Sequence, residues 1–93
     1  MKNYPNLNKA IAKVLYQRRL ELELSKKKLS ERASITRIHI SDLEGGSKNP
    51  TMNAVFFLCD ALELDPKEFI IRVQKEIKKI EEGIETENAE SQK

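Results

Sequence analysis

Five side chains between residues 36 and 42 combine hydrogen-bond donors, hydrogen-bond acceptors and apolar groups within one short segment. The segment reads TRIHISD, and in a helix that turns Ile40 and Leu43 inward it exposes Thr36, Arg37, Ile38, Ser41 and Asp42. An arginine can donate two hydrogen bonds to guanine, and a carboxylate can accept one from cytosine. Isoleucine and the threonine methyl group can contact the methyl group of thymine. The segment therefore has the chemistry of a base-reading surface.

Simpler interpretations of the same residues remain open at this point. Arg37 can equally hold a phosphate, and Ile38 can pack half-buried against a neighbouring element. His39, the only histidine in the chain, has no partner that would suggest catalysis or metal binding, and a solvated side chain explains it.

Helical periodicity runs through most of the chain, and no segment alternates as a strand does. Apolar residues at positions 7, 11, 14, 15 and 22 predict a helix over 7–22. Further helices are predicted over 25–33, 36–44 and 51–62, the last with positions 52, 55, 58, 59 and 62 facing the core, and a fifth begins at 65. The expected N-caps are Asn6, Ser25, Thr36, Thr51 and Asp65.

The second and third helices are too short to be stable alone, because isolated helices below about 12 residues are marginal. They must share a core with the first and fourth. The tight link at 33–35 makes the pair a helix-turn-helix, in which the second helix of the pair enters the major groove.

Composition and charge limit the other functions that the chain could have. Residues 1–50 carry eleven basic and five acidic side chains, against six and ten in residues 51–93, so the first half suits a polyanion partner. No apolar run approaches the roughly 20 residues of a membrane span, and the N-terminus has no export signal. One cysteine, expected to be buried, indicates neither a disulfide nor a metal site, so we expect a cytoplasmic protein without cofactors. No arrangement of residues indicates an enzyme.

Residues 7–70 resemble the helix-turn-helix family of phage repressors and Cro proteins. The shared pattern is Arg19, Leu24-Ser25, Leu29, Ala33, Ile35-Thr36, Ile40, Leu43-Glu44, Gly46, Pro50-Thr51, Leu62, Leu64 and Pro66. The resemblance implies an all-α, compact five-helix, lambda-repressor-like domain that binds double-stranded DNA and regulates transcription. Glu23 and Ser34 stand where the family usually has glycine, at positions that can require a positive φ. Lys26 stands where the family often has glutamine.

The resemblance also assigns roles to individual residues. Base contacts are expected from the five residues of the 36–42 segment given above. Phosphate contacts are expected from Ser25, Lys26, Ser47, Lys48 and Asn49, and more weakly from Arg18, whereas Lys27 and Lys28 can be merely solvated. Arg19 and Glu44 resemble a pair that forms a structural salt bridge between the first and third helices in relatives.

We expect the chain to have three regions. A DNA-binding domain at 1–70 is followed by an extension of the fifth helix at 71–84 and by a polar tail at 85–93 that we expect to be disordered. Apolar residues spaced like a heptad seam, together with Phe57, predict a self-association surface and a homodimer on an inverted repeat. The residues of this surface are Phe57, Ile70, Val73, Ile77, Ile80 and Ile84. Two alternatives remain: the seam packs inside its own domain, or the protein is an antitoxin-type autorepressor whose C-terminal helix binds an unknown protein partner.

Overall fold

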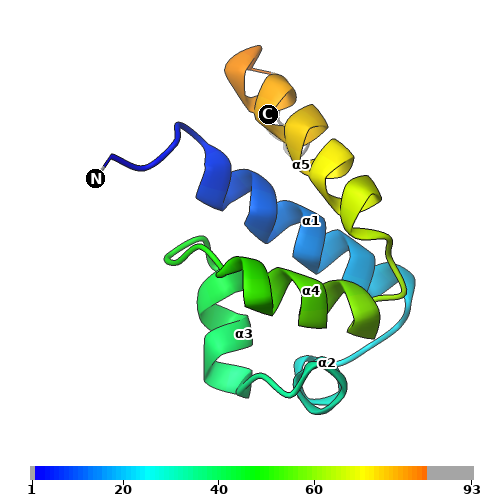
Figure 1. The fold of residues 1–93 in the computed structure, drawn as a ribbon. Coiled ribbons are helices and arrows are strands. Elements are labelled where there is room, and N and C mark those ends of the chain that lie inside the picture. Colours follow the sequence, from blue (N-terminus) through cyan, green and yellow to red (C-terminus); the bar gives the residue numbers. More distant parts are fainter. Residues whose placement is uncertain (1, 84–93) are drawn as a thin grey trace, which may run out of the picture.

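The computed structural model of the chain describes residues 2–83, which form five helices and no strand. The helices are α1 (Leu7–Glu21), α2 (Lys26–Ala33), α3 (Arg37–Glu44), α4 (Met52–Ala61) and α5 (Pro66–Glu81). α1 and α5 lie side by side, α4 crosses below them, and α2 and α3 form the opposite end of the molecule (Figure 1). The all-α, five-helix prediction is confirmed.

Four of the five predicted N-caps are present. The side chains of Ser25, Thr36, Thr51 and Asp65 each accept a hydrogen bond from a backbone N–H in the first turn of the helix that follows. Asn6 was wrongly predicted to be a cap of this kind. Its backbone is left-handed, with φ 65°, and its side chain makes no capping bond.

Three helices end in left-handed residues that are not glycine. Glu23, Ser34 and Glu63 have φ values of 57°, 56° and 53°. The first two were expected from the sequence, and the third was not. In each case the next residue is apolar and lies in or against the core, namely Leu24, Ile35 and Leu64. This apolar contact after the helix end helps to offset a backbone cost of roughly 1–2 kcal/mol per residue.

One hydrophobic core joins all five helices. Its most fully buried large side chains are Phe69, Leu15, Leu29, Ile40, Leu43, Leu58, Leu62 and Cys59. Burial raises the pKa of the Cys59 thiol to about 11, so the cysteine is a packed apolar group, as expected. The prediction that position 52 faces the core is wrong, because Met52 is 65% exposed at the start of α4.

The structure corrects the interpretation of the heptad seam in α5. Val73 is buried, and Ile77 and Ile80 are partly buried against the same core, so this side of α5 packs on α1 within one chain. Of the other predicted self-association residues, Phe57 and Ile70 are exposed, whereas Ile84 and the tail at 85–93 lie outside the described residues. The intramolecular alternative therefore describes the seam from Val73 to Ile80.

Candidate nucleic-acid interface

The short helix α3 is held by its two buried residues and by its cap. Ile40 and Leu43 are almost completely buried and point towards α1 and α2. The Thr36 hydroxyl accepts the His39 N–H at 3.1 Å and satisfies one donor of the first turn. Because Ile40 and Leu43 are buried one turn apart, they fix the orientation of this eight-residue helix. Its opposite face is therefore presented to solvent in a defined orientation.

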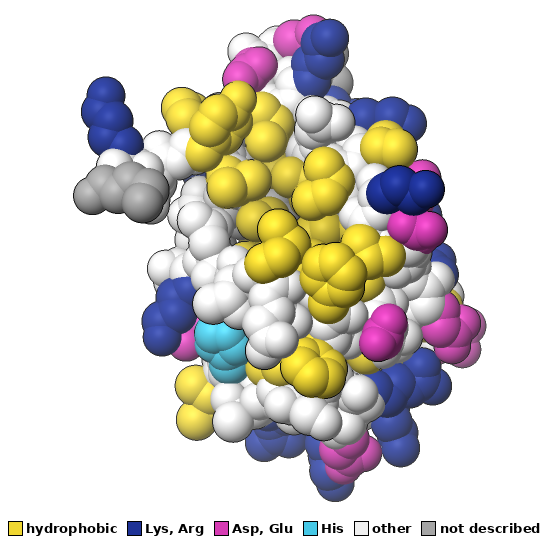
Figure 2. Space-filling view, in the orientation of Figure 1, with side chains coloured by type: hydrophobic (Ala, Val, Ile, Leu, Met, Phe, Trp, Pro, Cys, Tyr) yellow, Lys and Arg dark blue, Asp and Glu magenta, His cyan; other side chains and the backbone are white. Residues whose placement is uncertain are grey.

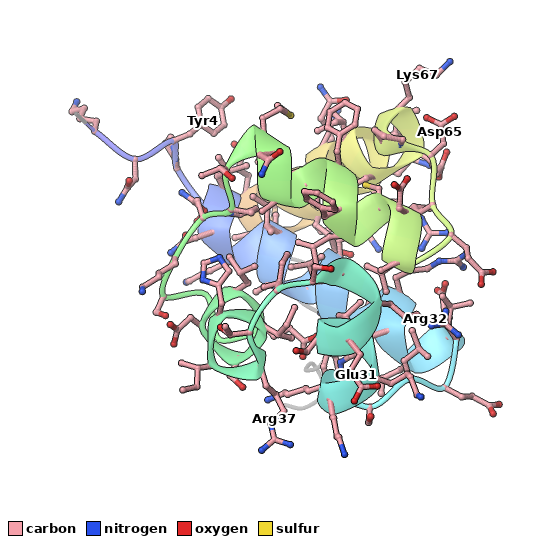
Figure 3. The ribbon with its side chains drawn as sticks, turned by 60° about the horizontal axis from the view of Figure 1, so that its bottom comes forward. Tyr4, Glu31, Arg32, Arg37, Asp65 and Lys67 are labelled. Carbon is pink, nitrogen blue, oxygen red and sulfur yellow. The ribbon has the colours of Figure 1, made fainter. Side chains whose placement is uncertain are left out.

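That outer face consists of side chains with different hydrogen-bonding character. Ile38 is 77% exposed, the largest exposed fraction among the large hydrophobic residues of the described chain. Arg37 extends away from the body of the protein at the end formed by α2 and α3 (Figure 3). Thr36 and Ser41 are exposed, and Asp42 is half-buried. All five residues expected to read bases therefore lie on α3 or at its cap, with accessible side chains.

The far end of α3 is anchored to α1 by polar contacts. The Arg19 guanidinium donates two hydrogen bonds to the Glu44 carboxylate, at 2.8 and 2.9 Å, and a third to the Leu24 carbonyl at 2.9 Å. Glu44 raises the pKa of Arg19, and the Arg19 guanidinium carbon lies 5.5 Å from the centre of the Tyr16 ring. Arg19 and Glu44 thus form the structural pair that the resemblance implied.

A second polar anchor was not anticipated from the sequence. The Asn8 side-chain amide donates to the Gly46 carbonyl at 2.6 Å, which ties the loop after α3 to the first turn of α1. Gly46 has φ 78°, a conformation that glycine adopts without strain. The only signal in the sequence was the polar residue at position 8, and its partner 38 residues away could not be read from local spacing.

The start of α2 lies beside the outer face of α3. The Lys26 ammonium is 3.4 Å from the Ser41 hydroxyl, which brings a residue expected to bind phosphate next to one expected to read bases. The Ser25 hydroxyl accepts the Lys28 N–H at 3.0 Å and caps the helix. The first N–H groups of a helix have no partner within it, so this terminus offers hydrogen-bond donors and positive charge to an anion.

The loop after α3 places a second cation beside the same face. The Lys48 ammonium is 3.4 Å from a carboxylate oxygen of Asp42. The Ser47 N–H and hydroxyl both donate to the Asp42 carbonyl, at 3.1 and 3.2 Å, and hold the loop against the helix end. Asn49 is exposed. Lys26 and Lys48 therefore lie beside two neighbouring residues of α3, Ser41 and Asp42.

Arg18 does not belong to this surface. Its guanidinium donates to the Leu62 and Glu63 carbonyls, at 2.9 and 3.0 Å, and pairs with Glu21 at 3.0 Å. It stabilises the C-terminal end of α4 against α1, and these intramolecular partners leave it poorly suited to a phosphate. These contacts argue against Arg18 as a residue that binds DNA.

No helix within residues 2–83 has the length and apolar character needed to cross a membrane. The same part of the chain contains no group of three or more His, Cys, Asp or Glu side chains arranged to hold a metal ion.

The fold and the exposed face of α3 agree with what comparison with known proteins shows. The family model described as "Helix-turn-helix" matches residues 15–69, more than half of the chain. A search of curated proteins found no match.

Solved structures of similar fold include restriction-modification controller proteins and a gene regulator. The wild-type restriction-modification controller protein C.Esp1396I is 26% identical, with a TM-score of 0.74 over 84% of this chain and 99% of that one. The C.Esp1396I tetramer in complex with its natural 35 base-pair operator gives 25% identity and a TM-score of 0.72, over 82% of this chain and 97% of that one. The clp gene regulator ClgR from C. glutamicum shares the fold, with 22% identity and a TM-score of 0.71 over 77% of this chain and 94% of that one.

The fold, the helix pair and the family match together define a class of protein: a DNA-binding transcriptional regulator. The chain belongs to the helix-turn-helix family, and the resemblance to phage repressors and Cro proteins is confirmed.

Proposed function

We propose that the protein reads the major groove of double-stranded DNA with α3 and binds an inverted repeat as a homodimer. The observation that carries this proposal is the outer face of α3. It is rigidly held, polar, and exposes Arg37 and Ile38 to solvent. Among residues 2–83, no hydrogen bond or ion pair engages the Arg37 guanidinium, so its donors are available for a base.

The proposed division of labour follows the geometry. Thr36, Arg37, Ile38, Ser41 and Asp42 contact base edges, and these contacts distinguish sequences directly. The phosphate contacts come from Ser25, Lys26, Ser47, Lys48 and Asn49 on the two sides of α3, and they contribute affinity and register. Because no catalytic arrangement is part of this surface, we infer a binding function without catalysis.

Selection of bound sites from random double-stranded DNA tests the base-reading role. The selected site should be preferred over random DNA by the wild-type protein. Arg37→Ala should relax the preference at one or two base pairs, with a loss of about 1–3 kcal/mol for the preferred base. Equal losses on selected and random DNA would reassign Arg37 to the phosphate backbone, and failure to select any site would reject sequence-specific binding.

The surface proposed for the homodimer is the exposed apolar surface of α4 and α5. It contains Met52, Phe56, Phe57, Ile70 and Ile71, which are 65%, 55%, 48%, 45% and 42% exposed. Figure 2 shows hydrophobic side chains gathered on the face that these two helices present. A contiguous apolar patch of this kind marks an interaction site. Two of its members, Phe57 and Ile70, were expected from the sequence; the other three were not.

A second copy of the chain is the occupant that fits best. One helix-turn-helix reads few base pairs, and two-fold pairing doubles the readout on a palindromic site. The tetrameric C.Esp1396I assembly on its operator supports self-association in a protein of this fold. In the antitoxin-type alternative the C-terminal helix binds a protein partner, but the α5 seam from Val73 to Ile80 is packed against α1 within the described residues. The observations therefore favour the homodimer.

Two matched substitutions test this surface. Phe57 and Leu20 are equally exposed, at 48%, but Leu20 lies on α1 outside the apolar surface. Phe57→Ser should weaken self-association about tenfold or more in analytical ultracentrifugation, because buried aromatic anchors dominate interfaces. Leu20→Ser should leave it unchanged. A wild-type protein that is monomeric at every concentration, or two variants that behave alike, would place the interface elsewhere.

A further inference from the structure

We propose that the Asp42–Lys48 ion pair couples base recognition to a phosphate contact, so that Lys48 is a specificity-determining residue although it touches no base. In the free protein the Lys48 ammonium pairs with the Asp42 carboxylate. The ammonium leaves the carboxylate when Asp42 accepts a hydrogen bond from a base, and it remains paired when the base has no donor to offer. This inference rests on the proposed function and assigns a role to two of its residues acting together.

The first step is the geometry of the pair. The Lys48 ammonium lies 3.4 Å from the Asp42 carboxylate, and the two side chains are 59% and 34% exposed. The Asp42 carbonyl accepts both hydrogen bonds from Ser47, which fixes Ser47 against Asp42, and Lys48 is the next residue in the chain. The ammonium is therefore held within reach of the carboxylate, while its long, exposed side chain can still turn away.

The second step is the electrostatic problem that Asp42 creates. A carboxylate on the outer face of α3 would be repelled by the phosphates that line the groove. The nearby ammonium of Lys48 offsets this charge when no base does so. An ammonium has three donors and no fixed plane, so it can leave the carboxylate for a phosphate without rearranging the loop.

The third step is the base. In the major groove cytosine and adenine present an amino group, which can donate to a carboxylate, whereas guanine and thymine present a carbonyl oxygen at the corresponding place. Opposite an amino group Asp42 gains a partner of its own, and Lys48 becomes available to a phosphate. Opposite a carbonyl oxygen the carboxylate needs its counter-ion, and Lys48 stays where it is. The preferred site thus gains one phosphate contact more than the substituted site.

Salt dependence measures that extra contact directly. Each phosphate neutralised adds about 0.9 to the slope of log K against log salt concentration. The base pair read by Asp42 is identified as the position at which Asp42→Asn changes the sites selected from random DNA. For the wild-type protein, the slope on the selected site should exceed the slope on a site altered at that pair by about 0.9.

Variants of both residues make the test specific. Lys48→Met should remove the slope difference between the two sites, because no ammonium is then left to move from Asp42 to a phosphate. Lys48→Arg should retain the slope difference. Asp42→Asn should tighten binding to random DNA, because Lys48 is then always available to a phosphate. As a matched control, Lys27→Met removes a charge from an exposed helix position and should leave the slope difference between the two sites unchanged.

The outcomes separate this inference from the proposed function. Equal slopes for wild-type protein on the two sites, or a slope difference that persists in Lys48→Met, would overturn the coupling while leaving base reading by α3 intact. Unchanged site selection by Asp42→Asn would overturn it as well, because Asp42 would then read no base. Failure of the wild-type protein to prefer any sequence would instead reject the proposed function itself.

Discussion

The Arg19–Glu44 pair should contribute more to stability than any other ion pair described in residues 2–83. Its side chains are 9% and 5% exposed, and the guanidinium makes three hydrogen bonds shorter than 3.0 Å. Glu44→Gln would leave Arg19 as a buried charge without its counter-ion. Removing one partner of a buried pair costs about 3–5 kcal/mol, whereas the stability of a whole domain is about 5–15 kcal/mol.

This loss can be measured by urea and thermal unfolding followed by circular dichroism. A loss of about 3 kcal/mol corresponds to a fall in Tm of roughly 12–24 °C for a domain of this size. The control is Glu31→Gln, which breaks a pair with Lys28 whose side chains are 59% and 53% exposed at a distance of 3.6 Å. An exposed pair of that kind contributes about 0.5 kcal/mol or less.

DNA binding distinguishes a loss of stability from a loss of contacts. Arg19 and Glu44 lie between α1 and the C-terminal end of α3, away from the outward side chains that are proposed to read bases. At a temperature where Glu44→Gln is still folded, its affinity for a selected site should therefore match that of the wild-type protein. A destabilisation below about 1 kcal/mol would show that the buried charge is compensated in some other way, and the reasoning from burial would be wrong.

Three further changes test other parts of the structure. Lys26→Ala should weaken binding to all sequences about equally and reduce the salt slope by roughly one unit; an unchanged slope in a titration series would remove it from the phosphate contacts. Ile77→Asp should destabilise the monomer by about 2 kcal/mol in urea unfolding, because it places a charge against the core; normal unfolding with lost self-association would restore the seam as an interface. Arg18 and Arg72 lower the pKa of Glu21, so this carboxylate stabilises the fold above its unfolded pKa, near 4.5, and the contribution disappears as the pH falls below its lowered value. The difference in unfolding free energy between Glu21→Gln and wild type should thus be larger at pH 7 than at pH 3.

Much of the DNA-facing end was predictable because its signals are local. The caps at Ser25 and Thr36 identify where two helices start, and the inward positions Ile40 and Leu43 determine which face of α3 remains outside. When Ile40 and Leu43 are buried, Arg37 and Ile38 lie on the opposite face of α3 and are exposed to solvent. The need for a positive φ at Glu23 and Ser34 was also readable, because the resemblance supplied glycine at those positions.

Contacts between distant residues could not be read in the same way. A spacing of three and four residues from Val73 to Ile80 produces an apolar stripe on α5, but the spacing is the same whether the stripe faces another chain or α1. Likewise, the sequence cannot tell whether Arg18 binds a DNA phosphate or the Leu62 carbonyl, which is 44 residues away in the chain. The sequence by itself determined the helices, their ends and the composition of the face that α3 presents, because each depends on neighbours within one or two turns. Only the tertiary structure decided what covers α5, where Arg18 points and which side chains of α4 remain exposed, because each depends on how the helices pack together.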